Sequence, residues 1–136
     1  MKLSPHLTFD GQCEAAFKFY ERCLGGTIIV MLSYGESRMA NQVPPEWAEK
    51  ILHATLSVGD DTLVGADSFP GRYDQPKGFH VLLGIADPAE AEHVYHALAE
   101  NGTVQMPLQE TFWAVRFGVL VDQFGISWEI NCEHAR

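Results

Sequence analysis

The chain has 136 residues and a mass of 15.1 kDa, which is the size of one small domain. Hydrophobic residues make up 46% and charged residues 20%, so the composition excludes a disordered protein. The net charge of −9 repels phosphate backbones, and no basic run offsets it, so nucleic acid is not an expected partner. No apolar run reaches the ~20 residues that a membrane span needs, and the N-terminus has no signal-peptide pattern. We therefore expect a cytoplasmic protein with no membrane partner.

Two helices are predicted from apolar residues at helical spacing. The first spans residues 12–24 and is followed by two glycines that stop it. Its apolar face consists of Cys13, Ala16, Phe17, Tyr20 and Leu24. The second begins at Asp87, an N-cap residue that is followed by Pro88 and Glu90 in the pattern of a capping box. Its apolar face consists of Ala91, Val94, Tyr95 and Leu98, and Gly102 ends it.

Strands are predicted for the other periodic segments. They are residues 6–9, 27–34, 53–58, 62–67, 79–85, 103–108, 113–121 and 127–131, with hairpin turns at 59–61 and 122–125. Each half of the chain then has the order β-α-β-β-β, and Leu7 and Phe9 in the first half correspond to Val81 and Leu83 in the second. The sequence predicts a single domain over residues 1–136, built from two copies of one module, at about 1–70 and 77–136.

Three potential metal ligands lie on three of these predicted strands. Side chains alternate along a strand, so His6 points away from the apolar face formed by Leu7 and Phe9. The same alternation places His80 and Glu129 opposite the apolar faces of their own strands. If the apolar faces pack against the helices, these three side chains turn toward a common concavity. Two imidazoles and a carboxylate can hold a divalent metal ion and leave positions open for a substrate.

Several motifs give the chain a resemblance to a known family. They are residues 4–9 (SPHLTF), 15–20 (AAFKFY), 24–26 (LGG), 109–113 (QETFW), 117–118 (FG), 122–125 (DQFG) and 128–131 (WEIN). On these motifs the whole chain resembles the vicinal oxygen chelate superfamily, also called the glyoxalase/bleomycin-resistance/dioxygenase fold. Within it the chain is most similar to the PhnB-like branch, often labelled demethylubiquinone methyltransferase-like.

The resemblance implies an α+β fold in which two βαβββ modules form a cup-shaped mixed β-sheet, with the helices packed outside. It also implies one divalent metal ion (zinc, manganese, iron or nickel) held by His6, His80 and Glu129. Glyoxalases of this superfamily use a fourth ligand, whose position falls at Val64 or Gly65, and neither residue can bind a metal. The three-ligand set is instead similar to those of extradiol dioxygenases and fosfomycin-modifying enzymes.

Three further residues are candidates for substrate binding, each with a structural alternative. His53 could line the cup, or it could be a surface histidine at a strand end. Trp113 could form an aromatic wall with Phe112 and Trp128, or these rings could pack in the core. Arg116 could hold an anionic substrate group, or it could form an ordinary salt bridge. No residue beyond the metal ligands is assigned a catalytic role.

Two functions are compatible with these features. The first is a divalent-metal-dependent enzyme that acts on a small oxygen-rich metabolite, with the reaction left open. The alternative is a metal-free protein of the bleomycin-resistance type that binds and sequesters a small molecule. A methyltransferase activity is not expected, because the chain has no glycine-rich loop between a strand and a helix to hold a nucleotide-like cofactor. The resemblance also implies a homodimer, and twofold dimers are the commonest soluble oligomers.

Overall fold

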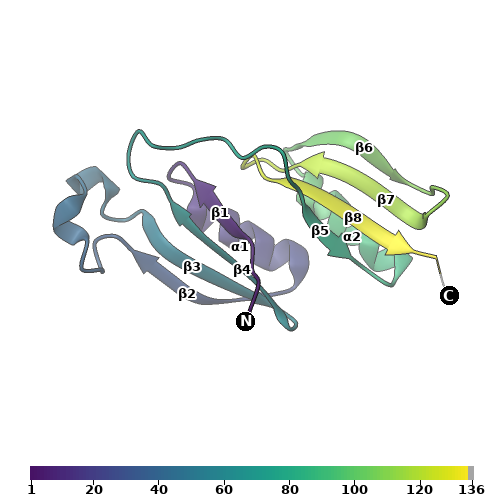
Figure 1. The fold of residues 1–136 in the computed structure, drawn as a ribbon, viewed down its shortest axis with the longest axis horizontal. Coiled ribbons are helices and arrows are strands. Elements are labelled where there is room, and N and C mark those ends of the chain that lie inside the picture. The colour runs from purple at the N-terminus through teal and green to yellow at the C-terminus, as the bar shows by residue number, and fades with distance from the viewer. Residues whose placement is uncertain (135–136) are drawn as a thin grey trace. The chain divides into compact units, whose positions relative to one another are not determined.

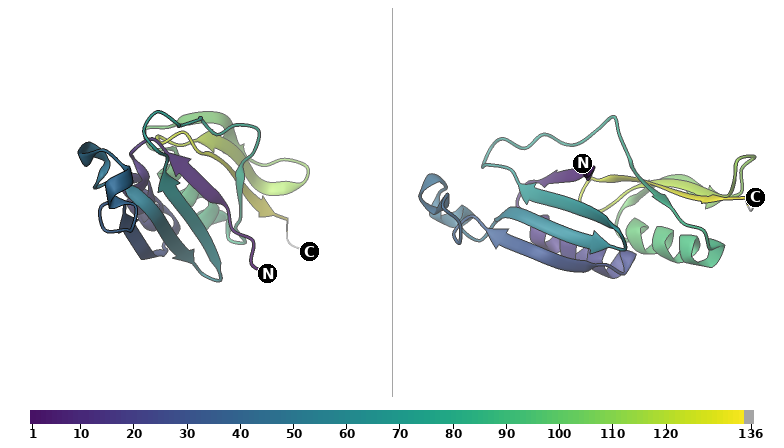
Figure 2. Two further views of the ribbon diagram at one scale, coloured as in Figure 1. Left: turned by 60° about the vertical axis from the view of Figure 1, so that its left-hand side comes forward. Right: turned by 60° about the horizontal axis from the view of Figure 1, so that its bottom comes forward.

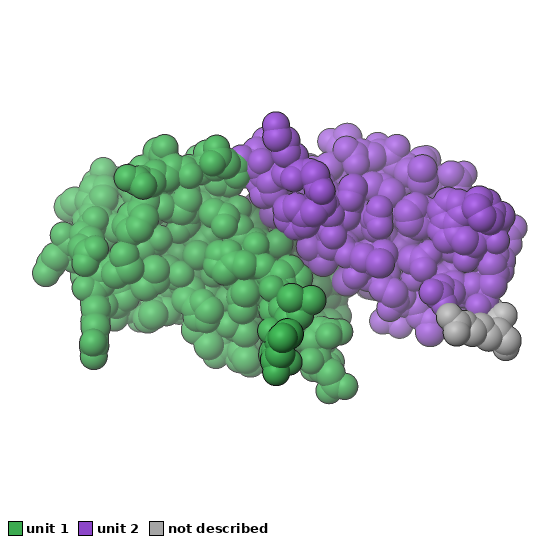
Figure 3. All heavy atoms as spheres, viewed as in Figure 1, with its two compact units in different colours: residues 1–74 green, residues 75–136 purple. Residues whose placement is uncertain are grey.

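The computed structural model describes residues 1–134 of the chain. The chain divides into two compact units, Met1–Asp74 and Gln75–Arg136, here called unit 1 and unit 2 (Figure 3). Each unit contains one four-stranded sheet and one α-helix. No helix within the described residues is both long enough and apolar enough to cross a membrane.

Unit 1 contains one long helix and two short 3-10 turns besides its sheet. Its elements are β1 (His6–Phe9), α1 (Cys13–Leu24), β2 (Thr27–Ser33), η1 (Ala40–Gln42), η2 (Pro45–Trp47), β3 (Ile51–Val58) and β4 (Asp61–Asp67). The strand order is β1-β4-β3-β2, with β1 parallel to β4 and the other pairs antiparallel. Helix α1 covers one face of this sheet, and the other face carries no helix (Figures 1 and 2).

Unit 2 repeats this arrangement. Its elements are β5 (Val81–Gly84), α2 (Pro88–Ala99), β6 (Thr103–Gln109), β7 (Ala114–Val121) and β8 (Ser127–Glu133). The strand order is β5-β8-β7-β6, with β5 parallel to β8, and α2 packs on one face (Figure 2). The predicted α+β fold class and its two βαβββ modules are therefore confirmed.

Each helix packs closely on its sheet because a strand glycine leaves room for an aromatic ring. In unit 1, a Cβ atom added at Gly65 would lie 2.7 Å from Cε1 of Phe17 on α1. In unit 2, a Cβ atom added at Gly118 would lie 2.6 Å from Cε2 of Tyr95 on α2. Any side chain at either position would push the helix off the sheet.

Strand β5 is shorter than the sequence predicts. The expected strand over residues 79–85 begins only at Val81, where pairing with Trp128 of β8 starts. Gly78 has a φ of +83°, a left-handed conformation, and it precedes the two residues that lie outside the ladder. Alternation along the predicted strand puts Phe79 on the same face as Val81, but Phe79 is 46% exposed because it lies before the first residue paired with β8. His80 therefore precedes β5 rather than lying within it.

Candidate functional site

Two of the predicted metal ligands lie close together in unit 2: Glu129 on the face of the sheet opposite α2, and His80 just before β5. Along β8, Trp128, Ile130 and Cys132 are fully buried. Alternation places Glu129 on the opposite face, paired in register with Leu82 of β5. The Nδ1 atom of His80 lies 3.8 Å from Oε1 of Glu129, and their side chains are 36% and 31% exposed. Both groups are therefore reachable from solvent.

The separation of these two groups suits a shared metal ion. Nitrogen and oxygen ligands lie about 2.0–2.2 Å from a divalent transition metal, so two ligands of one ion are at most ~4.4 Å apart. The 3.8 Å between His80 and Glu129 falls within that limit. His80 also lines a pocket of about 340 Å³ in unit 2, together with Lys77, Phe79, Gln105 and Ser127. The pair thus has both the donor chemistry and the adjoining space that a metal and a small ligand require.

The third predicted ligand, His6, belongs to unit 1. It is exposed at the start of β1, and its register partner is Val64 of β4, which in turn pairs with Thr55 of β3. Within residues 1–134, no group of three histidine, cysteine, aspartate or glutamate side chains is close enough to hold one metal ion. His80 and Glu129 therefore lie close together in unit 2, and His6 lies in unit 1.

His53 lies on the same open face of the unit 1 sheet as His6. Residues paired across strands share a face, so His6, Val64 and Thr55 lie in one row, and His53 is two residues from Thr55 on β3. The Nε2 atom of His53 is 3.2 Å from Oγ1 of Thr55, within hydrogen-bond distance. The imidazole is exposed, and this contact orients it.

The other two predicted substrate-binding residues differ in their surroundings. Trp113 is 45% exposed and lies just before β7, with its ring 5.3 Å from that of Phe117 and 4.7 Å from that of Phe112. Arg116 donates from Nε to Oε1 of Glu92 on α2 at 3.1 Å, so it forms the salt bridge that was its structural alternative.

Asp67 of β4 is close in sequence to the position where glyoxalases have a fourth ligand, but it has a structural role. Its side chain is 1% exposed. Oδ1 accepts hydrogen bonds from the backbone amides of Gly11 and Cys13 at 2.9 and 3.0 Å, and Oδ2 accepts one from Ile51 at 2.8 Å. The carboxylate thus joins the start of α1 to the start of β3.

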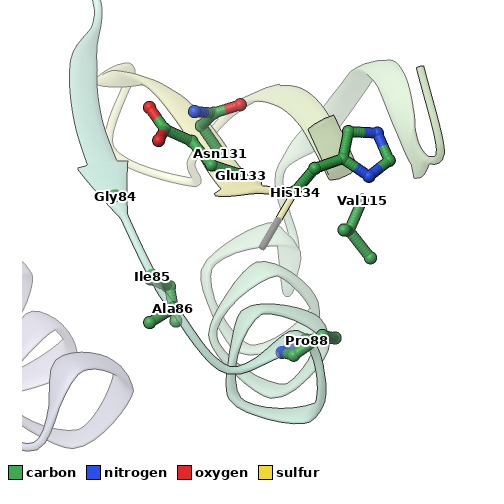
Figure 4. A pocket seen from close by; sticks show the side chains of 8 residues that line it. All are labelled: Gly84, Ile85, Ala86, Pro88, Val115, Asn131, Glu133 and His134. Atoms are coloured by element: carbon green, nitrogen blue, oxygen red, sulfur yellow. The ribbon is translucent and has the colours of Figure 1, made fainter. Parts of the chain in front are cut away.

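A second pocket in unit 2 was not predicted from the sequence. It has a volume of about 650 Å³ and lies between the ends of β5 and β8 and the start of α2 (Figure 4). Asn131, which lines it, is the next residue after Glu129 on the open face of β8. The period of two along the strand could have indicated Asn131, but the pocket itself depends on how the strand ends meet.

Comparisons with known proteins agree with this architecture. The chain is 33% identical over 139 residues to protein YjdN of Escherichia coli K12, covering 96% of this chain and 95% of that protein. Its fold is similar to that of protein PA1353 from Pseudomonas aeruginosa, with a TM-score of 0.91, 43% identity and 99% of both chains covered. It is also similar to a PhnB protein from Bacillus cereus, with a TM-score of 0.81, 25% identity and coverage of 97% and 99%.

More distant structures share the fold alone. One is a glyoxylase/bleomycin resistance protein/dioxygenase domain from Frankia sp. EAN1pec, with a TM-score of 0.64, 15% identity and coverage of 98% and 95%. The likeness to this domain shows that the two share the two-module fold. Residues 1–131 match the family described as 3-demethylubiquinone-9 3-methyltransferase, and the chain belongs to this PhnB-like family.

Proposed function

We propose that this protein is a divalent-metal-dependent enzyme that acts on a small oxygen-rich metabolite. His80 and Glu129 would bind the metal together with His6. The observation that carries the proposal is the solvent-accessible His80–Glu129 pair, whose 3.8 Å separation suits a single ion. His6 joins the set because it occupies the equivalent place in the other module, with apolar residues one and three positions after it as they are after His80.

The chain's own residues have distinct tasks in this proposal. A bound divalent cation would act as a Lewis acid toward a substrate oxygen. Glu129 would supply one negative charge and His80 a nitrogen ligand. A divalent cation held by them would keep net positive charge, which would attract an oxygen-rich substrate. His53, oriented by Thr55, is a candidate on the unit 1 face to exchange a proton with the substrate.

Methyl transfer is not part of the proposal, although the family's description names it. The loop between β1 and α1 has the sequence Asp10-Gly11-Gln12, which lacks the repeated glycines of a nucleotide-binding turn. Here the amide of Gly11 donates to Asp67. This loop is therefore not a glycine-rich turn of the kind that holds a nucleotide-like cofactor.

A second candidate function is metal-free binding of a small molecule. It is favoured by the aromatic side chains beside β7, where Phe112 is 92% and Trp113 is 45% exposed. Exposed aromatic rings are common where proteins recognise flat apolar ligands. We further propose that the chain forms a homodimer, since large apolar side chains remain exposed on unit 2. We also propose that it acts in the cytoplasm.

Thermal unfolding with and without metal distinguishes the two functions. Protein freed of metal with a chelator is melted alone and with added Zn²⁺, Mn²⁺, Fe²⁺ or Ni²⁺. A specific site stabilises the folded state by about 2.7 kcal/mol when free metal is 100 times Kd, which raises the melting temperature by several degrees. The Glu129→Gln variant should lose this increase and His53→Gln should keep it. Equal melting temperatures under all conditions would contradict the metal-dependent function.

A further inference from the structure

The pocket beside His80 in unit 2 gathers several hydrogen-bond donors. Its volume of about 340 Å³ suits a small molecule. Lys77, Gln105 and Ser127 line it, and each has a side chain that can donate a hydrogen bond. Among the described residues that line it, none is an aspartate or a glutamate. A cation and two neutral donors without an acidic neighbour in the wall favour a negatively charged ligand.

Lys77 supplies the positive charge of this pocket. Within the described residues of unit 2, the side chains with a full positive charge are Lys77 and Arg116, and Arg116 is paired with Glu92. No ion pair or hydrogen bond engages the Lys77 ammonium within residues 1–134. The chain has a net charge of −9, so acidic partners for a lysine are plentiful. The ammonium group is therefore available to a ligand.

The carboxylates near this pocket do not block an anion. Asp122 precedes the lining residue Gly125 by three positions, but it is buried and accepts hydrogen bonds from within its own turn. Glu129 lies 3.8 Å from His80 and shares a strand face with Ser127, which is two residues before it on β8. Its charge weakens anion binding in metal-free protein, and a cation bound beside it would offset that charge.

Gly78 shapes the backbone between Lys77 and His80. It has a φ of +83°, in the left-handed region that favours glycine. Strand β5 begins only at Val81, so these residues belong to the segment that leads into the strand. With this turn in the backbone, Lys77 and His80 both line the same pocket. A charged group and a proposed metal ligand are thus held at one small space.

We propose that this pocket binds the carboxylate of the substrate, so that the enzyme acts on small oxygen-rich carboxylic acids. The Lys77 ammonium, with the donors of Gln105 and Ser127, holds the carboxylate oxygens, and the rest of the substrate extends toward His80. One lysine balances one negative charge, which favours a carboxylate over a doubly charged group. The identification of this ligand as a substrate rests on the proposed function, whereas carboxylate binding itself requires no metal ion.

The test compares two probes that differ at the charged group. Lactate has a carboxylate, and lactamide replaces it with a neutral amide of similar size. Each probe is titrated into metal-free ¹⁵N-labelled protein at about pH 7 and low ionic strength, and amide shifts are followed by NMR. We expect shifts at Lys77, Gly78 and Ser127, with lactate binding roughly five- to tenfold more tightly, as one charge-assisted hydrogen bond provides. Equal affinities, or shifts that map elsewhere, would overturn the proposal.

Variants of the lysine identify the group that holds the anion. Lys77→Gln should bind the two probes equally, and Lys77→Arg should keep the preference for lactate because it keeps the charge. Lys18→Gln is the matched control, because it makes the same change in net charge on α1 of unit 1. It should prefer lactate as the parent does. If Lys77→Gln keeps the preference, the lysine does not hold the carboxylate and the proposal is wrong.

Glu129→Gln separates this proposal from the metal-dependent function. It removes a proposed metal ligand and a neighbouring negative charge, so it should bind lactate more tightly than the metal-free parent. Lactate binding no tighter than in the parent would place the anion away from His80 and contradict the proposal. Because every titration uses metal-free protein, a purified protein without metal would contradict the proposed function while leaving carboxylate binding to be judged by these titrations.

Discussion

Asp67 in unit 1 and Asp122 in unit 2 are buried carboxylates that accept hydrogen bonds from within the protein. Asp122 accepts from the amides of Phe124 and Ile126 at 2.8 and 3.1 Å, and from Nε1 of Trp128 at 2.9 Å. Each aspartate therefore fixes a connection in its module. A sequence alone does not separate such a residue from a metal ligand, because both are acidic residues near strand ends.

The first prediction concerns Asp67. Its replacement by alanine leaves three buried or half-buried backbone amides without their acceptor, so we expect a loss of about 3–5 kcal/mol in the free energy of unfolding. Asp10→Ala is the matched control, because Asp10 is exposed in the same loop and should change stability by less than about 0.5 kcal/mol. Urea denaturation measures both. A similar small loss in the two variants would show that the Asp67 hydrogen bonds contribute little.

The second prediction concerns the buried thiol of Cys13. Burial, and secondarily the nearby Asp67 carboxylate, raise the pKa of this thiol well above its ordinary value of 9.0. Above pH 9 the unfolded chain releases this proton while the folded chain keeps it, so folding stability falls as pH rises. Between about pH 9.5 and 11, Cys13→Ala should reduce that slope by about 1.4 kcal/mol per pH unit. Parallel stability curves for parent and variant would contradict the shift.

At the scale of elements, much of the fold could be predicted because local signals agree with the tertiary structure. Asp87 accepts a hydrogen bond from the amide of Glu90 at 3.2 Å, as the capping pattern before α2 predicts. The start of β5 could not be predicted, because the sequence alternates through Phe79 while the ladder with β8 begins only at Val81. Pairing across strands, not alternation, decides where a strand begins.

The third prediction tests the contact between a helix and its sheet. Gly118→Ala places a Cβ atom 2.6 Å from the Tyr95 ring and 3.1 Å from Cα of Leu108, so we expect a loss of about 2–3 kcal/mol in stability. Gly84→Ala is the control, since its Cβ atom meets nothing within 4 Å. It should be neutral or stabilise the strand by up to about 1 kcal/mol. Thermal melting of both variants checks the contrast, and equal losses would refute it.

At the scale of the whole molecule, the two modules have the same topology but different open faces. The unit 1 face carries His6, His53 and Thr55, while the unit 2 face carries Glu129 and Asn131. Alternation is local, so the sequence predicts that His6 and Glu129 lie opposite the apolar faces of their strands. It could not predict the pocket at Gly84 or the His80–Glu129 distance, because both depend on how separate segments meet.

The fourth prediction concerns assembly. The proposed homodimer should sediment with twice the 15.1 kDa mass of the chain at micromolar concentration, in the presence of a reducing agent. Reduction should leave the assembly intact because the thiols of Cys13, Cys23 and Cys132 are buried and none takes part in a disulfide within the described residues. Sedimentation at the mass of one chain across the whole concentration range would contradict the dimer.

The most direct test of the proposed function is the metal content of the purified protein. Untagged protein prepared without chelators is analysed by elemental mass spectrometry, beside His6→Ala, His80→Ala and Glu129→Ala. His53→Ala is the control, because His53 is an exposed histidine outside the proposed set of ligands. We predict close to one divalent ion per chain in the parent and in His53→Ala, and a large loss in the other three variants. A parent without metal after reconstitution, or variants that all retain it, would contradict the proposed site.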